Sequence, residues 1–189
     1  TYASPADCLA ARVSSAADAL RRVGVSPSDA ARAAALLEPV VASLVITGRP
    51  LAAANAALPL PDEPVERLWQ LTTTLREHRG DAHVAALVTC GLSGLDAHLL
   101  HVAAGEAKWG SRGWTDEERD AAMNDLVERG LLASGGSLTA AGVALRAEVE
   151  ARTDAASPSC ADVEPLRPMT RAAETLLWYP NPIGLPARG

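Results

Sequence analysis

The stretch ERGLLASGGSLTAAGVALRAEVE, residues 128–150, decides the fold class that the sequence predicts. Leu131 and Leu132 form an apolar pair before a double glycine, and Leu138 follows those glycines. Apolar residues on the two sides of a tight Gly-Gly turn are typical of two short strands. A long helix is expected to begin at Thr139, because threonine is a frequent helix N-cap. The stretch therefore predicts a small β-hairpin followed by a helix.

Two further helices precede this hairpin in the sequence. Thr115 can cap a helix over residues 115–129, and Glu118 stands three residues later, which is the spacing of a capping box. A shorter helix is expected near residues 95–104, and the loop at 105–114 joins the two. The order is therefore helix, loop, helix, hairpin and long helix.

The remaining segments also favour helices. Small side chains must fill the core, because Phe is absent and aromatic residues make up 3% of the chain. From Pro64 the pattern predicts either one long helix or two helices joined at Gly80-Asp81. Other helices are expected at 5–23, from 27 to about 46 with Pro39 inside, and from about 162 to 177, with a linker that holds a short helix at most at 51–64. The chain divides into an N-terminal helical segment and linker (1–63), a central domain (64–156), and a C-terminal helix and Pro-rich tail (157–189).

The segments VERGLL and SLTAAGVALRAEVE, in this order of helices, resemble the DNA-binding half of MarR-like winged helices over about residues 81–155. Together with GRPLAAANAALPLP, LREHRGDAHVAAL, SRGWTDEE and PNPIGL, the chain is similar to an actinobacterial SalK-like helix-turn-helix family. The resemblance implies an all-α fold with a small β-hairpin wing, that is, a winged helix-turn-helix domain plus flanking helices. Members of that family carry a further N-terminal helical region that this chain lacks. The difference implies that the region is dispensable or comes from a protein partner, either a second copy in a homodimer or a separate chain.

The charges of this domain oppose DNA binding. In such domains the second helix of the motif enters the major groove, and Arg or Lys there and on the wing neutralise phosphates. The net charge of −6 adds no compensating basic surface, and the turn at 133–137 carries no charge. The helix itself opens with four carboxylates, Asp116, Glu117, Glu118 and Asp120. We therefore expect no nucleic-acid partner, and a MarR-like, ligand-responsive DNA-binding transcription regulator is the alternative function.

The cysteines and the hydropathy pattern predict a cytoplasmic protein. Cys8, Cys90 and Cys160 are odd in number, far apart and outside any CxxC motif, which favours reduced thiols. No apolar run reaches the length of a membrane span, and no signal peptide begins the chain. We expect no membrane association.

The densest chemistry of the chain lies in LREHRGDAH, residues 75–83. If the helix is continuous, His78 falls on its apolar seam, where a buried imidazole needs partners. The i, i+3 spacing brings Asp81 to His78, and the neighbouring arginines fall on an adjoining face. In the alternative, His78 satisfies a core hydrogen bond and Arg79 pairs with a nearby carboxylate. The candidate catalytic residues are His78, Asp81 and His83, and the candidate substrate-binding residues are Arg76, Arg79, Arg112 and Trp114.

Such a cluster favours proton transfer on a small polar or anionic metabolite. Histidine titrates near neutral pH, and arginine binds carboxylate, sulfate or phosphate groups. The hypothesis is a cofactor-independent enzyme, or a subunit of one, in natural-product biosynthesis that catalyses an elimination, a ring closure or a hydrolysis. We expect no metal site, because His98 and His101 lack an HExxH motif and a Cys partner. A non-catalytic scaffold or carrier is a further alternative.

Overall fold

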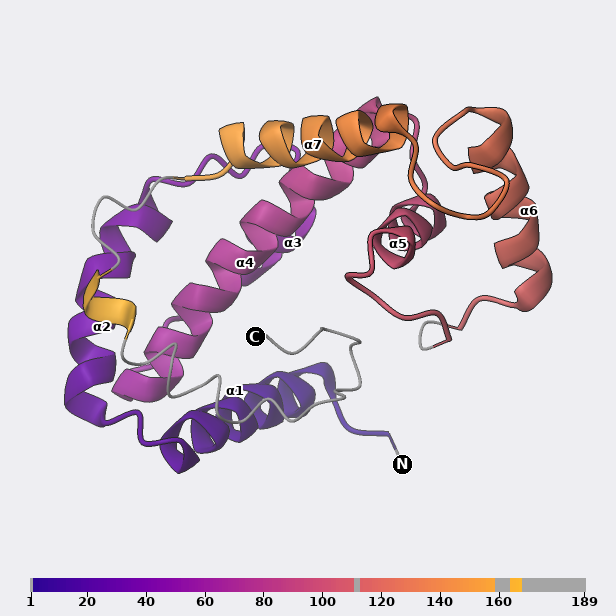
Figure 1. Cartoon of the computed structure of the whole chain (residues 1–189). Coiled ribbons are helices and arrows are strands. Elements are labelled where there is room, and N and C mark those ends of the chain that lie inside the picture. Colours follow the sequence, from indigo (N-terminus) through magenta and orange to yellow (C-terminus); the bar gives the residue numbers. More distant parts are fainter. Residues whose placement is uncertain (1, 111–112, 159–163, 168–189) are drawn as a thin grey trace. The chain divides into compact units, whose positions relative to one another are not determined.

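The computed structural model describes residues 2–110, 113–158 and 164–167. These residues form seven α-helices and one 3-10 helix and contain no β-strand, so the expected helical architecture is confirmed (Figure 1). The expected helix over 162–177 and the Pro-rich tail lie largely outside the described residues. The elements are α1 (Pro5–Arg22), α2 (Pro27–Ala42), α3 (Pro50–Ala56), α4 (Pro64–Thr89), α5 (Gly94–Ala103), α6 (Asp116–Glu128), α7 (Ala140–Ala155) and the 3-10 helix η1 (Glu164–Leu166).

Hydroxyl side chains mark the start of five of these helices. The N-cap residues are Ser4, Ser26, Ser93, Thr115 and Thr139. Each hydroxyl accepts a hydrogen bond from the backbone N–H three residues later, which satisfies a donor that has no partner within the helix. Thr115 forms the expected capping box with Glu118, so α6 begins where the sequence predicted.

Three helices, α2, α3 and α4, differ from the expected bounds or decide between the alternatives that the sequence left open. α4 is one continuous helix of 26 residues, so no break occurs at Gly80. α2 ends earlier than expected, because the Ser43 hydroxyl donates to the carbonyl of Val40 and competes with the helical backbone for it. α3 forms within the expected linker and gives it one short helix.

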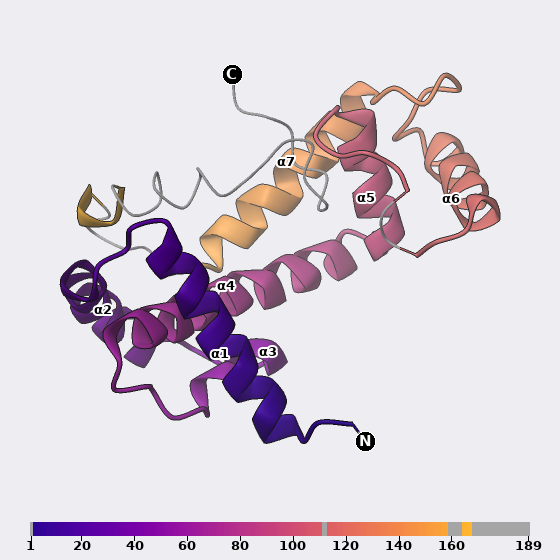
Figure 2. The same ribbon diagram turned by 90° about the horizontal axis from the view of Figure 1, so that it is seen from below.

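The described residues divide into two compact units, and the division falls inside α4. Residues up to Asp81, with those from Ser157 onward, form the first unit, and Ala82–Ala156 form the second. In the first unit, α1 and α2 lie beside the beginning of α4 (Figure 2), and the three helices share one apolar core. Alanine and leucine supply most of it, as the scarcity of aromatic residues predicts. Its buried residues are Ala17, Val25, Ala30, Ala33, Ala34, Leu37, Val65, Leu68 and Leu71.

The second unit contains the end of α4 with α5, α6 and α7. α5 and α6 contact each other, and α7 contributes Val149 to the same leucine-rich core. Because that core joins residues from all four helices, the unit has its own apolar interior. Its buried residues are Ala86, Leu87, Leu92, Leu99, Leu100, Leu126, Leu131, Leu132 and Val149.

The expected β-hairpin wing does not form as two strands. Between α6 and α7 the structure has one isolated antiparallel bridge, Leu132 with Leu138, around the turn of residues 133–137. The backbone amides of Leu131 and Leu132 both donate to the carbonyl of Leu126 at the end of α6. On the other side, Thr139 already caps α7. One residue on each side is left for pairing, which is too few for a strand.

Candidate functional site

His78 is buried in the first unit, where it holds the segment between α2 and α3. Its Nε2 lies 3.1 Å from the carbonyl oxygen of Val45, and Arg49 Nη1 donates to the His78 carbonyl at 2.6 Å. A carbonyl only accepts, so Nε2 carries the proton and Nδ1 the lone pair. Nδ1 is buried and has no hydrogen-bond partner among the described residues. Burial, followed by the charge of Arg49, lowers the pKa of His78, which keeps the ring neutral.

Asp81 supplies a cap for α3. Its carboxylate accepts a hydrogen bond of 2.9 Å from the backbone N–H of Ala52, in the first turn of that helix. The N-cap residue of α3 is Arg49, whose side chain makes no capping hydrogen bond. The Asp81 carboxylate on α4 therefore accepts from a first-turn N–H of α3, as a local Ser or Thr does in the other capped helices. Its negative charge is also favourable at a helix N-terminus.

The predicted binding residues that the structure describes have separate local surroundings. Arg76 is on the surface, with 79% of its side chain exposed, and pairs with Glu77 at 2.6 Å. Arg79 is exposed as well. Trp114 lies in a ring cluster with Trp109 and His98, 5.5 Å from the His98 ring between centroids. Arg112 lies outside the described residues. His83, by contrast, lines a pocket.

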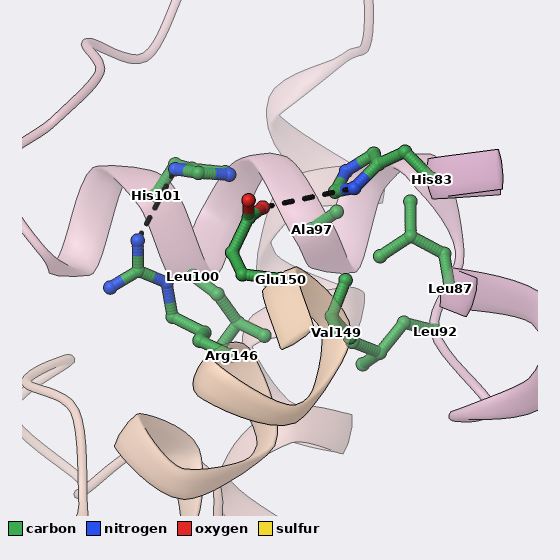
Figure 3. Close-up of a pocket in the computed structure, with 9 residues that line it drawn as sticks. All are labelled: His83, Leu87, Leu92, Ala97, Leu100, His101, Arg146, Val149 and Glu150. Atoms are coloured by element: carbon green, nitrogen blue, oxygen red, sulfur yellow. Dashed lines mark hydrogen bonds and ion pairs between the residues drawn. The ribbon is translucent and has the colours of Figure 1, made fainter. Parts of the chain in front are cut away.

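His83 lines a pocket of the second unit (Figure 3). The pocket lies between the end of α4, α5 and α7, and its cavity volume is about 20 Å³, enough for one water-sized group. Among the predicted site residues that the structure describes, only His83 lines it. Five apolar residues form its floor, Leu87, Leu92, Ala97, Leu100 and Val149, and four polar ones its rim, His83, His101, Arg146 and Glu150.

The His83 ring is oriented by α7. Its Nδ1 lies 3.2 Å from the hydroxyl oxygen of Thr153 and 3.8 Å from a carboxylate oxygen of Glu150. The Thr153 hydroxyl gives its only proton to the carbonyl of Val149, at 2.8 Å, so its oxygen accepts from His83. In the neutral ring the proton is therefore on Nδ1 and the basic lone pair on Nε2. This is the arrangement in which a second group fixes the tautomer of an acid–base histidine.

Arg146 and His101 converge on the carboxylate of Glu106. Arg146 Nη2 and His101 Nδ1 both donate to Glu106 Oε2, the latter at 2.8 Å. The two nitrogen atoms are 3.4 Å apart, the spacing of two donors around one oxygen. The hydrogen bond from Arg146, and next that from His101, lowers the pKa of Glu106, so it is ionised at neutral pH. Figure 3 shows Arg146 extending from α7 toward His101 on α5.

A tight helix end places Glu106 beside these two donors. The amide of Glu106 donates to the carbonyl of His101, and the amide of Gly105 donates to that of Val102. This pair of bonds is the Schellman motif, which needs a left-handed residue at the position after the helix cap. Gly105 supplies it with a φ of 75°. The side chain after the glycine is thereby turned back along α5.

The exposed face of α6 is acidic. Six carboxylates on it are exposed, Asp116, Glu117, Glu118, Asp120, Asp125 and Glu128. The arginine of this helix, Arg119, is held by Asp116 at 2.9 Å and by Asp120 at 2.8 Å. The turn at 133–137 adds no charge. A face of this kind repels the phosphates of DNA.

A family model described as a helix-turn-helix family matches residues 1–177. The chain belongs to this helix-turn-helix family. Comparisons with curated proteins and with solved structures found no match. Within the described part of this helix-turn-helix protein, no single helix is both long and apolar enough to cross a bilayer. No group of three His, Cys, Asp or Glu side chains there is arranged to hold a metal ion, and Cys8 and Cys90 are free thiols.

The sequence reasoning missed the residues that α7 and the end of α5 bring to His83. Arg146, Glu150 and Thr153 stand at i, i+4 and i+7, so they lie along one face of α7. That spacing was visible in the sequence and could have identified a polar stripe on an otherwise mixed helix. Glu106 could not be identified in this way, because its position depends on the helix end at Gly105.

Proposed function

We propose that this helix-turn-helix protein binds a small anionic metabolite in the pocket of the second unit, and that His83 acts there as a general acid or base. The supporting observation is the orientation of His83, whose tautomer is fixed by Thr153 beside a pocket that Arg146 also lines. A histidine with a fixed tautomer and a nearby carboxylate is the usual apparatus of proton transfer. Glu150, 3.8 Å from His83 Nδ1, is the carboxylate that stabilises the protonated ring.

The anionic character of the ligand is inferred from the charges at the rim. Arg146 and His101 are donors, and they already hold a carboxylate, that of Glu106. Arginine recognises carboxylate and phosphate groups more strongly than neutral acceptors, because its hydrogen bonds are charge-assisted. The apolar floor can contact a very small uncharged part of the same ligand, since the cavity volume is about 20 Å³.

The chemistry that suits this set is a proton-transfer reaction. An elimination, a ring closure by intramolecular substitution, or a hydrolysis each needs a base to remove a proton and an acid to return one. In this proposal His83 Nε2 takes the proton, and Arg146 holds the anionic group of the substrate. The protein is then an enzyme, or a subunit of one, in a biosynthetic pathway.

A titration of the full-length protein with simple anions tests the binding step. Acetate, phosphate and sulfate are added separately, and the histidine ring and arginine side-chain signals are followed by NMR. We expect at least one anion to shift the signals of His83, His101 and Arg146 in a saturable way. Arg146→Gln should remove that response, and Arg76→Gln, at an exposed arginine that does not line the pocket, should keep it.

Two results would contradict the proposal. One is the absence of a saturable response to every anion. The other is an equal response in wild type and Arg146→Gln, which would place the anion elsewhere. For the catalytic step, His83→Gln should retain anion binding and lose turnover of any substrate that is found. Equal turnover in both proteins would remove His83 from the mechanism and leave a binding protein.

The second candidate is a ligand-responsive regulator that binds DNA, and the helix-turn-helix family match favours it. The six exposed carboxylates of α6 argue against it, since DNA affinity in such proteins comes largely from phosphate neutralisation. A gel-shift assay with the promoter region of its own gene, at several salt concentrations, separates the two. Specific binding near physiological salt would reverse the order of the candidates.

We also propose a protein partner, either a second copy of the chain or a separate polypeptide. Val84 and Val88 are 59% and 69% exposed on consecutive turns of α4. Residues four apart lie on one helix face, and exposed apolar patches mark protein contact sites.

A further inference from the structure

The carboxylate of Glu106 takes up two hydrogen-bond donors that a ligand in the pocket could use. Two donors from different helices, Arg146 on α7 and His101 on α5, meet at one oxygen of this side chain. Both donors also line the pocket, whereas Glu106 does not. Glu106 and a ligand in the cavity would therefore need the same two donors.

We propose that the pocket binds a small aliphatic carboxylate, and that Glu106 is an internal competitor that holds the carboxylate subsite until the ligand displaces it. The inference rests on the proposed anion site and adds the ligand class and the means of its regulation. In the ligand-bound form, the ligand carboxylate accepts from Arg146 and His101. Its aliphatic part contacts Leu100 and Val149.

The geometry favours a carboxylate over a larger anion. The two donor nitrogens are 3.4 Å apart and converge on a single oxygen of the Glu106 carboxylate, so they already accommodate a group of this class. A phosphate has more oxygens to satisfy, and the rim also carries Glu150, whose charge repels a second anionic arm. The cavity of about 20 Å³ limits the aliphatic part to a short one.

Glu106 is suited to displacement because little besides these two bonds holds its carboxylate. Its side chain is 49% exposed, whereas that of Arg146 is 22% exposed. An exposed ion pair is worth little in water, since solvation of the separated charges replaces most of the attraction. The Schellman turn at Gly105 nevertheless keeps Glu106 close, so it returns when the ligand leaves.

The test is a titration of full-length wild type and Glu106→Gln with sodium propionate, followed by NMR of the arginine and histidine side chains. Propionamide, which has the same shape without the charge, serves as the control ligand. Glu128→Gln removes an exposed carboxylate of α6 and controls for net charge. We expect Glu106→Gln to bind propionate about three- to fivefold more tightly than wild type, the factor associated with one exposed ion pair. Glu128→Gln should match wild type, and propionamide should bind neither protein.

Equal or weaker propionate binding by Glu106→Gln overturns the inference, because Glu106 is then neutral to the ligand or part of its site. If phosphate or sulfate binds the pocket and propionate does not, the ligand class is wrong while the proposed anion site stands. If no anion binds any variant, the proposed function and the inference fail together. Should Glu106→Gln lose its helical circular dichroism, Glu106→Asp replaces it, because the shorter side chain withdraws from Arg146 and should also tighten propionate binding.

Discussion

Gly142 in the first turn of α7 lies against the backbone carbonyl of Leu131, so close that a Cβ on the glycine would come within 2.2 Å of that oxygen. The same carbonyl accepts a hydrogen bond of 3.1 Å from the amide of Thr139. The contact joins the end of α6 to the start of α7 and holds the turn between them. Only a residue without a side chain allows it.

Gly142→Ala is therefore expected to destabilise the protein by about 1 to 3 kcal/mol, the usual cost of an added methyl group without room. Urea unfolding followed by circular dichroism measures the difference. Gly80→Ala is the matched control, because Gly80 is also helical and the nearest atom to its added Cβ is a flexible Glu77 oxygen at 3.8 Å. That variant should be more stable by about 0.5 to 1 kcal/mol. If Gly142→Ala instead stabilised the protein, the turn between α6 and α7 would have to shift to make room for the methyl group, and the prediction would be wrong.

His78 should make the stability of the protein depend on pH below its ordinary pKa of 6.5. The pKa of the folded form is lowered, chiefly by burial, so the unfolded chain binds the proton first as the pH falls. Stability is unaffected by this group above that pH and decreases below it, at no more than about 1.4 kcal/mol per pH unit for one proton. Urea unfolding at pH 7.5, 6.0 and 5.0 measures the trend.

His78→Gln provides the comparison for that pH series. Its amide can still donate to the carbonyl of Val45 but does not titrate. The stability difference between wild type and the variant should therefore change between pH 7.5 and 5.0. The glutamates with lowered pKa, Glu38, Glu63 and Glu106, lose their contributions only below pH 4.5, outside this window. A constant difference would mean that His78 keeps its ordinary pKa in the fold.

Asp81→Ala is expected to cost about 1 to 3 kcal/mol of stability, because it leaves the buried N–H of Ala52 without an acceptor. Thermal unfolding measures the loss. Arg76→Gln should stay within about 0.5 kcal/mol of wild type, as a surface substitution usually does. Both variants should keep anion binding in the pocket. Loss of binding in Asp81→Ala at unchanged stability would instead support the site that the sequence predicted around His78.

Charge reversal on α6 should create DNA binding that we do not expect of the wild type. In Glu117→Lys with Asp120→Lys, two exposed carboxylates become ammonium groups. Fluorescence anisotropy with a labelled DNA duplex should show binding at about 50 mM salt that is mostly lost at about 200 mM. The reason is that each phosphate contact adds about −0.9 to the slope of log affinity against log salt concentration. Asp18→Lys with Asp62→Lys makes the same change of net charge in the first unit and should not bind. Salt-sensitive binding by wild type would contradict this account of α6.

Val84→Ser with Val88→Ser should weaken association with the proposed partner. The two valines are the exposed apolar side chains on this part of α4, and serine removes their apolar contact area. Light scattering after size exclusion gives the mass of wild type and variant at equal concentration. Val143→Ser, at an exposed valine of α7, is the control and should associate as wild type does. A monomeric wild type that purifies without a partner would contradict the proposal.

Most of the helical architecture could be predicted because its signals are local. Ser26 and Thr115 accept hydrogen bonds from amides three residues later, so the start of each helix depends on a few neighbouring residues. The wing could not be predicted in this way. Whether Leu131 and Leu132 extend a ladder depends on where their amides donate, and both donate to Leu126 at the end of α6.

The candidate site was less predictable, because burial and long-range contacts decide what each polar residue does. Asp81 and His83 are two residues apart on one helix, yet the first caps α3 and the second meets Thr153, 70 residues later in the chain. The spacing along α4 could predict that Asp81 and His83 lie near each other, but it could not predict that they contact Ala52 and Thr153. The stripe of Arg146, Glu150 and Thr153 was predictable as a helix face, although not as the neighbour of His83.

The acidic face of α6 has a consequence for how much of the protein is available at any moment. A genome offers about 10⁶ or more nonspecific sites, and a basic helix-turn-helix protein spends most of its time on them. We expect the six exposed carboxylates of α6 to keep this chain from being retained there. A ligand of modest affinity would then meet the full concentration of the protein.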